Sequence, residues 1–339
     1  MSPMHQGRTG LPGRRAFLAG LGAATLGAGC SRRGVRGPLV LRLSHSMVAA
    51  KNSLHTFADR FRELVESRTG GDVTVRLFVS NTLGQERETV QQLQEGLIDF
   101  MVSGSAIWGS VAPRLQVLDF PFLWRDWDHV HRIVDGPLGL EVANYLEEAA
   151  RMRPLAFGDS FGFRQVITRT RPLHSPADFA GVKIRTIQSA IYVKAVELMG
   201  ASPTPMAFGE VYTSLHTGVI DGFEHDASTT LQQRFYEVAH VMTRTRHIAG
   251  VLGLWASAIT LKSLPADLRA IVETAARDAS THQRIEGPKE EALAATELTK
   301  LGMTIHEFDN NPFRVKAEAL WQAEGHTLGV TPWLRTIQA

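Results

Sequence analysis

One short motif occurs twice in the chain, and this repeat constrains the fold more than any other feature. The segments "LQEGLIDF" (93–100) and "LHTGVIDG" (215–222) share the pattern L-x-x-G-[L/V]-I-D, once in each half of the sequence. Each copy ends a predicted helix and leads into a predicted strand, as expected for a duplicated supersecondary unit. The repeat predicts two related α/β lobes, with a ligand bound between them at the carboxyl ends of strands.

The elements around the first copy alternate in the order expected of an α/β lobe with largely parallel strand pairing. Branched apolar residues predict strands over 38–44, 73–79 and 97–103. Helical spacing of apolar residues predicts one helix within 52–69, ended by two glycines, and another over 86–96.

The second half repeats this order. Strands are expected at 163–170, at the end of 175–187 and within 247–261, and helices at 190–200 and 209–218. A long helical region from Leu264-Pro265 to about Gly302 follows, and we expect an interruption at Gly287-Pro288. Its apolar stripe is expected to pack against the lobes.

The first 30 residues read as an export signal. Arg14-Arg15 precede a short Gly/Ala-rich apolar stretch that is too short to span a membrane, which resembles a twin-arginine signal. Cys30, the single cysteine, stands where a lipoprotein would be acylated, but Gly27 occupies a position that usually holds Leu. Lipidation of Cys30 and simple cleavage nearby both remain open, and an intrachain disulfide is excluded.

The net charge gives no indication of a nucleic-acid partner. Removal of residues 1–30 takes away three of the 36 basic residues and none of the 34 acidic ones, so the processed chain is almost neutral. Beyond the signal, no stretch of 18 consecutive apolar residues predicts a membrane span.

Four polar residues, Asp221, Glu224, His225 and Asp226, crowd into "TGVIDGFEHDAST" (217–229). A metal site would need ligands at converging spacings, such as H-E-x-x-H, and the segment has no second histidine. The chain also lacks the G-x-S-x-G and G-x-G-x-x-G motifs of hydrolases and dinucleotide-binding enzymes. The simplest alternative is that Asp221 and Gly222 form a turn while the other polar residues face solvent.

Three segments carry a resemblance to a known family. The segment "SPADFAGVKIRTIQSAIYVKAVELMGASPTPMAFGEVYTSLHTGVIDGFE" (175–224) is similar to the most characteristic block of solute-binding proteins of tripartite ATP-independent periplasmic (TRAP) transporters, the DctP family. The segments 77–100 and 235–248 extend the similarity, which covers roughly 39–310. The resemblance implies a two-lobed α/β periplasmic-binding-protein fold (type II-like) with long C-terminal helices.

The resemblance also implies a carboxylate receptor. Arg185, in "GVKIRT", matches the family arginine that forms a bidentate salt bridge with the ligand carboxylate, a task for which a planar guanidinium suits better than lysine. Arg164 matches a second family arginine that often touches the ligand. Phe208 corresponds to an aromatic residue that packs on the ligand's carbon skeleton, or belongs to the core.

Weaker expectations concern other cleft positions. Glu86 either accepts hydrogen bonds from ligand hydroxyls or caps its helix, and Trp108 is a cleft wall or a core residue. His225 stands where many members have an asparagine that binds the carboxylate, so it replaces an amide with a group that titrates near neutrality. Further expected contacts are His45, Ser46, Ser103 and Ser105.

The resemblance therefore implies an exported binding subunit that captures a small organic acid and delivers it to small and large TRAP membrane subunits. A sugar acid or another hydroxy or keto acid is expected first, and a C4-dicarboxylate second. We expect a periplasmic monomer without enzymatic activity, cofactor or metal. The alternatives are a sensory binding protein serving a receptor kinase, and a metal-dependent enzyme at 221–226.

The expected domain boundaries follow from the predicted elements. The signal occupies 1–30, one lobe comprises 38–160 plus about 250–285, and the other comprises 161–249 plus about 286–339.

Overall fold

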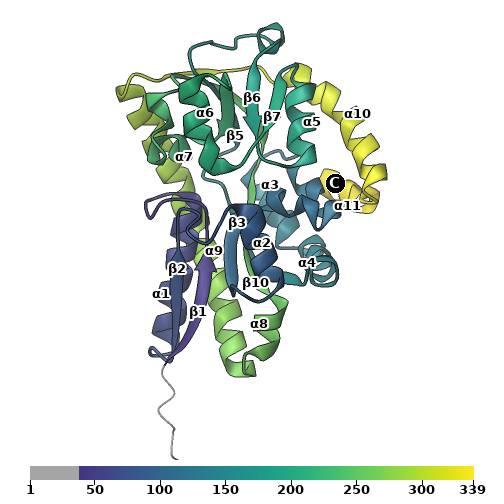
Figure 1. The fold of residues 1–339 in the computed structure, drawn as a ribbon. Coiled ribbons are helices and arrows are strands. Elements are labelled where there is room, and N and C mark those ends of the chain that lie inside the picture. Colours follow the sequence, from purple (N-terminus) through teal and green to yellow (C-terminus); the bar gives the residue numbers. More distant parts are fainter. Residues whose placement is uncertain (1–37) are drawn as a thin grey trace, which may run out of the picture. The chain divides into compact units, whose positions relative to one another are not determined.

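The computed structural model describes residues 38–339 (Figure 1). The predicted twin-arginine signal and Cys30 lie outside the described residues. Within the described part, no helix is both long enough and apolar enough to cross a membrane.

The first sheet has five strands in the order β2-β1-β3-β10-β4. β1 is parallel to β2 and to β3, whereas β10 runs antiparallel to β3 and β4. The parallel pairing predicted for the first three strands is therefore found, and the apolar segment 247–261 supplies an antiparallel strand. The strands are β1 (Leu39–Ser44), β2 (Val73–Phe78), β3 (Phe100–Gly104), β10 (Val251–Ser257) and β4 (Met152–Asp159).

The second sheet has six strands in the order β11-β9-β5-β8-β6-β7. β6 is parallel to β7 and β8, and β5 is antiparallel to β8 and β9. The strands are β5 (Arg164–Thr168), β6 (Lys183–Thr186), β7 (Ser202–Pro205), β8 (Gly222–His225), β9 (Val241–Ile248) and β11 (Thr304–Glu307).

The two sheets share one arrangement, which explains the repeated motif. β2-β1-β3-β10-β4 corresponds, strand for strand and direction for direction, to β7-β6-β8-β5-β9. Asp99 donates its backbone N–H to the carbonyl of Arg42 in β1, and its carboxylate accepts from the Arg42 N–H at 2.7 Å. Asp221 makes the same two bonds to Lys183 in β6, the side-chain bond at 2.9 Å. Each repeated aspartate thus fixes the strand that follows it against its parallel neighbour.

Helices flank the strands, and side chains cap the start of some of them. The side chain of Asn52 accepts from the His55 N–H at the start of α1, whose buried residues include Phe57 and Phe61. Helices that precede α9 are α1 (Ser53–Arg68), α2 (Glu86–Gln94), α3 (Trp127–Val134), α4 (Pro137–Ala150), α5 (Ala190–Leu198), α6 (Val211–Thr217), α7 (Ala227–Gln232) and α8 (Ala258–Ser263). Short 3₁₀ turns include η1 (Ser105–Ser110), η2 (Pro113–Asp119), η3 (Pro176–Phe179), η4 (Phe208–Glu210) and η5 (Phe235–Glu237).

One helix, α9 (Ala266–Lys300), contacts elements of both sheets. It packs on α1 and β4 along one part and on α7 along another (Figure 1). The interruption expected at Gly287-Pro288 is wrong, because the helix continues through Pro288, which only removes one backbone donor. Gly287 is needed for close packing, since a β-carbon there would lie 2.9 Å from Phe161. The chain ends with α10 (Asn311–Thr327) and α11 (Thr331–Gln338).

Candidate functional site

A small cavity of about 40 Å³ lies at the carboxyl ends of β1 and β3 from the first sheet and of β6 and β8 from the second. This is the position at which open α/β sheets bind ligands. The segments that join the sheets, 160–163 and 249–250, contribute Ser160 and Gly250 to its lining. Six residues expected from the sequence line it, namely Ser46, Glu86, Arg164, Arg185, Phe208 and His225.

Arg185 presents an open donor to this cavity. The residue is 1% exposed on the buried strand β6, and its Nε and Nη2 both donate to the Met206 carbonyl, at 3.1 and 2.8 Å. Its Nη1 has no hydrogen-bond partner among residues 38–339. Burial lowers the pKa of Arg185 to about 10, against an opposing effect of Glu224. The site therefore holds a desolvated cation with an unsatisfied donor, an arrangement that an anion would stabilise.

Arg164, by contrast, already has an anionic partner. Its Nη2 donates to Oε1 of Glu224 at 3.0 Å and to the Glu224 carbonyl at 2.7 Å, and its Nε also bonds the carboxylate. Burial alone would raise the pKa of Glu224, but Arg164 and His247 outweigh it and lower that pKa to about 2. Arg164 is thus held in a neutralised pair within the cavity wall.

Glu86 and Ser46 add oxygen atoms to the first-sheet side of the cavity. The Ser46 hydroxyl donates to Oε1 of Glu86 at 3.1 Å. Burial raises the pKa of Glu86, while the Ser46 hydrogen bond and the positive charges of Arg185 and Arg164 oppose that rise. Glu86 is not the helix cap, because Gln85 holds that position and pairs with Glu88. Its carboxylate is left facing the cavity, where it can accept hydrogen bonds.

His225 and Phe208 form an aromatic wall, with ring centroids 5.7 Å apart. His225 Nδ1 lies 2.9 Å from Oδ2 of Asp226, whose other oxygen caps α7 by accepting the Thr229 N–H. Burial lowers the pKa of His225, and Arg164 lowers it further, while Asp226 opposes both. Phe208 also packs edge-on against Phe235, so it belongs partly to the core and partly to the cavity.

The other four expected contacts do not line the cavity. All of them are at most 1% exposed, and each has a partner inside the protein. Trp108 packs against Trp255, with ring centroids 5.4 Å apart, as the core alternative predicts. His45 shares a hydrogen bond with His55, Trp108 donates to the Ser103 hydroxyl, and Ser105 donates to Asp119.

The sequence analysis missed Tyr192, which also lines the cavity. Its ring lies 5.4 Å from the guanidinium carbon of Arg164, and its hydroxyl is 3.5 Å from Oδ1 of Asp119. A usable signal was present, because the predicted helix over 190–200 begins directly after the strand of Arg185. Its first turn therefore had to lie near the same strand ends.

The polar cluster at 221–226 divides into separate roles. Asp221 bonds to Lys183, Glu224 pairs with Arg164, and His225 contacts Asp226. The expectation that the residues other than Asp221 face solvent is wrong, since Glu224, His225 and Asp226 are all buried. Among the described residues, no group of three His, Cys, Asp or Glu side chains is placed to hold a metal ion.

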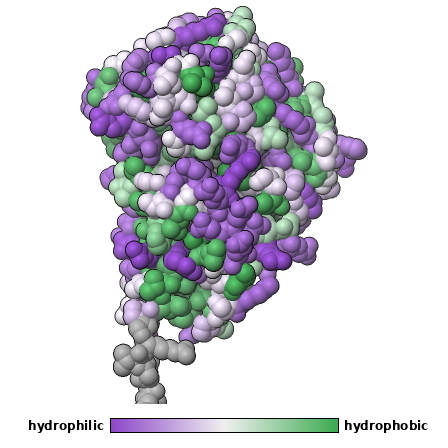
Figure 2. Space-filling model, viewed as in Figure 1, coloured by the Kyte–Doolittle hydropathy of each residue, from purple (hydrophilic) through white to green (hydrophobic). Residues whose placement is uncertain are grey.

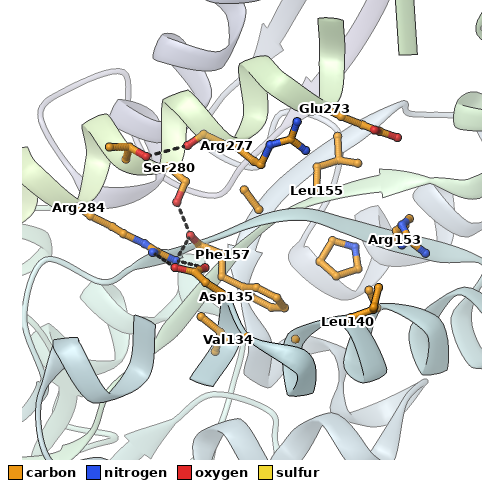
Figure 3. A pocket seen from close by; sticks show the side chains of 16 residues that line it. Val134, Asp135, Leu140, Arg153, Leu155, Phe157, Glu273, Arg277, Ser280 and Arg284 are labelled. Atoms are coloured by element: carbon orange, nitrogen blue, oxygen red, sulfur yellow. Dashed lines mark hydrogen bonds and ion pairs between the residues drawn. The ribbon is translucent and has the colours of Figure 1, made fainter. Parts of the chain in front are cut away.

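A second hollow lies outside this site, between α4 and α9 over strand β4 (Figure 3). Some of its polar side chains bond to one another or to the backbone that lines it. Arg284 bonds Asp135 at 2.6 and 3.0 Å and the carbonyl of Phe157, which also accepts from Ser280. It contains none of the residues expected from the sequence, so we place the candidate site in the cavity between the sheets.

Known proteins resemble the chain over most of its length. The family described as bacterial extracellular solute-binding protein, family 7 (DctP), matches residues 43–326. The 2,3-diketo-L-gulonate-binding periplasmic protein YiaO of Escherichia coli is 33% identical over 233 residues, which are 69% of this chain and 70% of that protein. The C4-dicarboxylate-binding periplasmic protein DctP of Rhodobacter capsulatus is 31% identical over 300 residues, 87% of this chain and 88% of that protein.

A solved structure shows the same fold. The chain matches a TRAP periplasmic solute-binding protein of Roseobacter denitrificans with bound L-galactonate, with a TM-score of 0.83 and 29% identity. The match covers 89% of this chain and 99% of that one. The two-lobed periplasmic-binding fold predicted from the sequence is confirmed.

Proposed function

This chain belongs to family 7 of the bacterial extracellular solute-binding proteins, and we propose that it captures a small organic acid through Arg185 and delivers it to small and large TRAP membrane subunits. The protein would act in the periplasm as a monomer, after export by the twin-arginine pathway. It would bind and release its ligand without chemical change.

The unpaired Nη1 of Arg185 is the observation that carries the proposal. A buried donor without a partner costs free energy, and a carboxylate oxygen at that position would satisfy it. Arg164 supports the site differently, because its pairing with Glu224 leaves Arg185 as the cation with an open donor.

A sugar acid, or another hydroxy or keto acid, is the preferred ligand. Hydroxyl groups can donate to the Glu86 carboxylate and exchange hydrogen bonds with Ser46. A second carboxylate beside Glu86 would meet like charge. The relatives that bind 2,3-diketo-L-gulonate and L-galactonate support this order, and the C4-dicarboxylate-binding relative keeps the dicarboxylate as the second candidate.

A thermal-shift screen tests the proposed function. A ligand that binds only the folded state raises the melting temperature, because at a hundredfold excess over Kd it adds about 2.7 kcal/mol to the free energy of unfolding. We expect sugar acids to give the largest increase, dicarboxylates a smaller one, and neutral sugars none. A panel in which no carboxylate changes the melting temperature would contradict the proposal.

Sensing rather than transport would instead be favoured by a neighbouring gene for a histidine kinase alone.

Replacement of Glu86 by glutamine tests the ligand class. Hydrogen bonds to charged groups contribute about 1.5–3 kcal/mol, so we expect the affinity for the best hydroxy acid of that screen to fall by roughly 10- to 100-fold. Succinate, which has no hydroxyl, should bind no more weakly than before, because a negative charge has been removed from the cavity. Calorimetry of both ligands checks this, with Glu95→Gln, at the exposed C-cap of α2, as the control. An equal loss for both ligands would be inconsistent with the role of Glu86.

The domain division expected from the sequence becomes a structural proposal. We assign 38–160 plus about 250–285 to the lobe of the first sheet, and 161–249 plus about 286–339 to the lobe of the second. The strand membership of the two sheets supports this division.

A further inference from the structure

Another hollow between the two sheets adjoins the candidate site, and we call it the outer chamber. Its volume is about 210 Å³, whereas the cavity that Arg185 lines, the inner cavity, has about 40 Å³. The two share Ser46, which follows β1, and Phe208, which begins η4, as walls. Further lining comes from the turn after β2, from α6 and from the segment after α7. A ligand that extends from Arg185 between Ser46 and Phe208 would therefore enter the outer chamber.

The inner cavity is smaller than a complete sugar acid. One water molecule needs about 10–15 Å³ of such volume, so a cavity of about 40 Å³ has room for about three waters. A sugar acid has several times as many non-hydrogen atoms. The inner cavity can therefore enclose the carboxylate and the atoms next to it, and the outer chamber is the adjoining space for the distal end of the ligand.

The outer chamber offers hydrogen-bonding groups without charge. None of the described residues that line it has a charged side chain, and hydrophilic residues are prominent over the middle of the molecule on the face in Figure 2. Nδ2 of Asn81 donates to Gln85 at 3.2 Å, which leaves Oδ1 of Asn81 to accept from a ligand. Nε2 of Gln233 lies 3.7 Å from the sulfur of Met47, so Oε1 of Gln233 is available in the same way. Two amide oxygens without a cation suit hydroxyl groups and disfavour a second carboxylate.

Aromatic rings line the same chamber. Phe208 lies between the chamber and the inner cavity, and Phe235 packs edge-on against it, with ring centroids 5.8 Å apart. The hydroxyl of Tyr212 donates to Glu237 at 2.9 Å, which restrains the Tyr212 ring. Flat apolar rings beside amide oxygens match a sugar ring, which has apolar C–H faces and a rim of hydroxyl groups.

The turn that carries Asn81 has an unusual backbone conformation. Ser80 and Asn81 have φ values of 54° and 57°, in the left-handed region that few residues other than glycine adopt. The Ser80 N–H donates to the Met47 carbonyl, and the Asn81 carbonyl accepts from the Gly84 N–H, both at 2.9 Å. Residues in this conformation persist where their surroundings fix them, and they cluster at ligand-binding sites. The turn therefore presents the Asn81 side chain to the chamber at a fixed position.

We propose that the outer chamber is a second sugar subsite, which binds a neutral sugar unit joined to the distal end of a sugar acid whose carboxylate lies at Arg185. The proposal rests on the proposed function and deepens it, because it names a glycosylated sugar acid as the preferred ligand. Asn81 and Gln233 accept hydrogen bonds from hydroxyl groups of the second sugar, and Phe208 packs where the two units join.

Calorimetry with a matched pair of ligands tests the subsite. Gluconate supplies the sugar acid alone, and melibionate is gluconate with galactose on the oxygen farthest from the carboxylate. We expect melibionate to bind roughly tenfold more tightly, because the galactose gains hydrogen bonds and aromatic contact. Asn81→Gly with Gln233→Ala should remove this advantage and leave gluconate binding unchanged. Glycine is the replacement at Asn81 because it tolerates the φ of 57°.

The matched control is Asn144→Ala with Gln322→Ala, which removes two exposed amides from α4 and α10 and should leave the affinity for both ligands unchanged. The second subsite would be overturned if melibionate bound the parent no more tightly than gluconate does. It would also be overturned if the double change at Asn81 and Gln233 weakened both ligands equally, or left the advantage of melibionate in place. In each case the proposed function would stand as long as sugar acids raise the melting temperature. A screen without any response to a carboxylate would remove both proposals.

Discussion

Replacement of Arg185 by alanine is expected to weaken binding of the carboxylate ligand by roughly 30- to 4000-fold. Truncating one partner of a buried charge pair costs about 2–5 kcal/mol, and a micromolar complex has only about 8 kcal/mol in total. Arg185→Lys should also lose much of the affinity. A lysine amine cannot hold the Met206 carbonyl and a carboxylate in the geometry of the planar guanidinium.

Two controls separate this effect from a loss of folding. Lys183→Ala removes an exposed cation from the same strand and should leave the affinity unchanged in calorimetry. Burial lowers the pKa of Arg185 to about 10, which means that its buried surroundings disfavour the charged form. Removing this charge relieves that cost, while the lost hydrogen bonds to the Met206 carbonyl oppose the gain, so the ligand-free Arg185→Ala protein should still melt cooperatively. An unchanged ligand affinity in this variant would remove Arg185 from the site.

Replacement of Glu224 by alanine is expected to destabilise the protein by about 3–5 kcal/mol, because it leaves Arg164 buried without its anion. At roughly 2–4 °C for each kcal/mol, the melting temperature should fall on the order of 10 °C. The matched control is Glu237→Ala, which breaks the exposed pair with Arg234 and should leave the melting temperature close to that of the parent. Replacing both partners, as Arg164→Met with Glu224→Leu, should cost less than the single change. Scanning calorimetry would refute the assignment if Glu224→Ala and Glu237→Ala melted alike.

The ion pair between Arg164 and Glu224 also makes the stability of the protein depend on pH. The folded pKa of Glu224, about 2, lies below its ordinary value of 4.5. A carboxylate with a depressed folded pKa contributes stability above its unfolded pKa, and the contribution is lost as the pH falls through the folded value. The stability of the parent should therefore decline between about pH 4.5 and pH 2. In the double variant Arg164→Met with Glu224→Leu this part of the decline should be missing.

The local elements were largely predictable, and the pairing of distant strands was not. Apolar periodicity located α1, α2 and α5 within a few residues, because one face of each helix is buried on its sheet. The antiparallel direction of β10 followed from no local signal, since β3, its neighbour, lies some 150 residues earlier in the chain. The break predicted at Pro288 failed because tertiary packing of the helix outweighed one missing hydrogen bond.

Within the candidate site, the sequence predicted which residues lie at strand ends. It did not predict which of their polar groups already have a partner inside the protein. Arg185 and His225 reach the cavity because they lie near the carboxyl ends of the parallel strands β6 and β8. Ser103 lies near the end of β3, and Ser105 and Trp108 follow that strand, but the polar atoms of all three have partners inside the protein. Arg164 pairs with Glu224 because β5 and β8 are neighbours, with Gln165 opposite His225. No local sequence pattern reveals this pairing of distant strands.

Helix α9 limits how the two sheets can move relative to each other. The sheets are connected by the short segments 160–163 and 249–250 and by this one helix of 35 residues. A helix of about 52 Å resists sliding and twisting. The helix is weakest to bending at Pro288, where one hydrogen bond is absent, and Gly287 there packs on Phe161 of the first connecting segment. The cavity should therefore open by a single rotation about the line through Gly287 and the two connecting segments. Most of the change should occur in a few backbone dihedral angles.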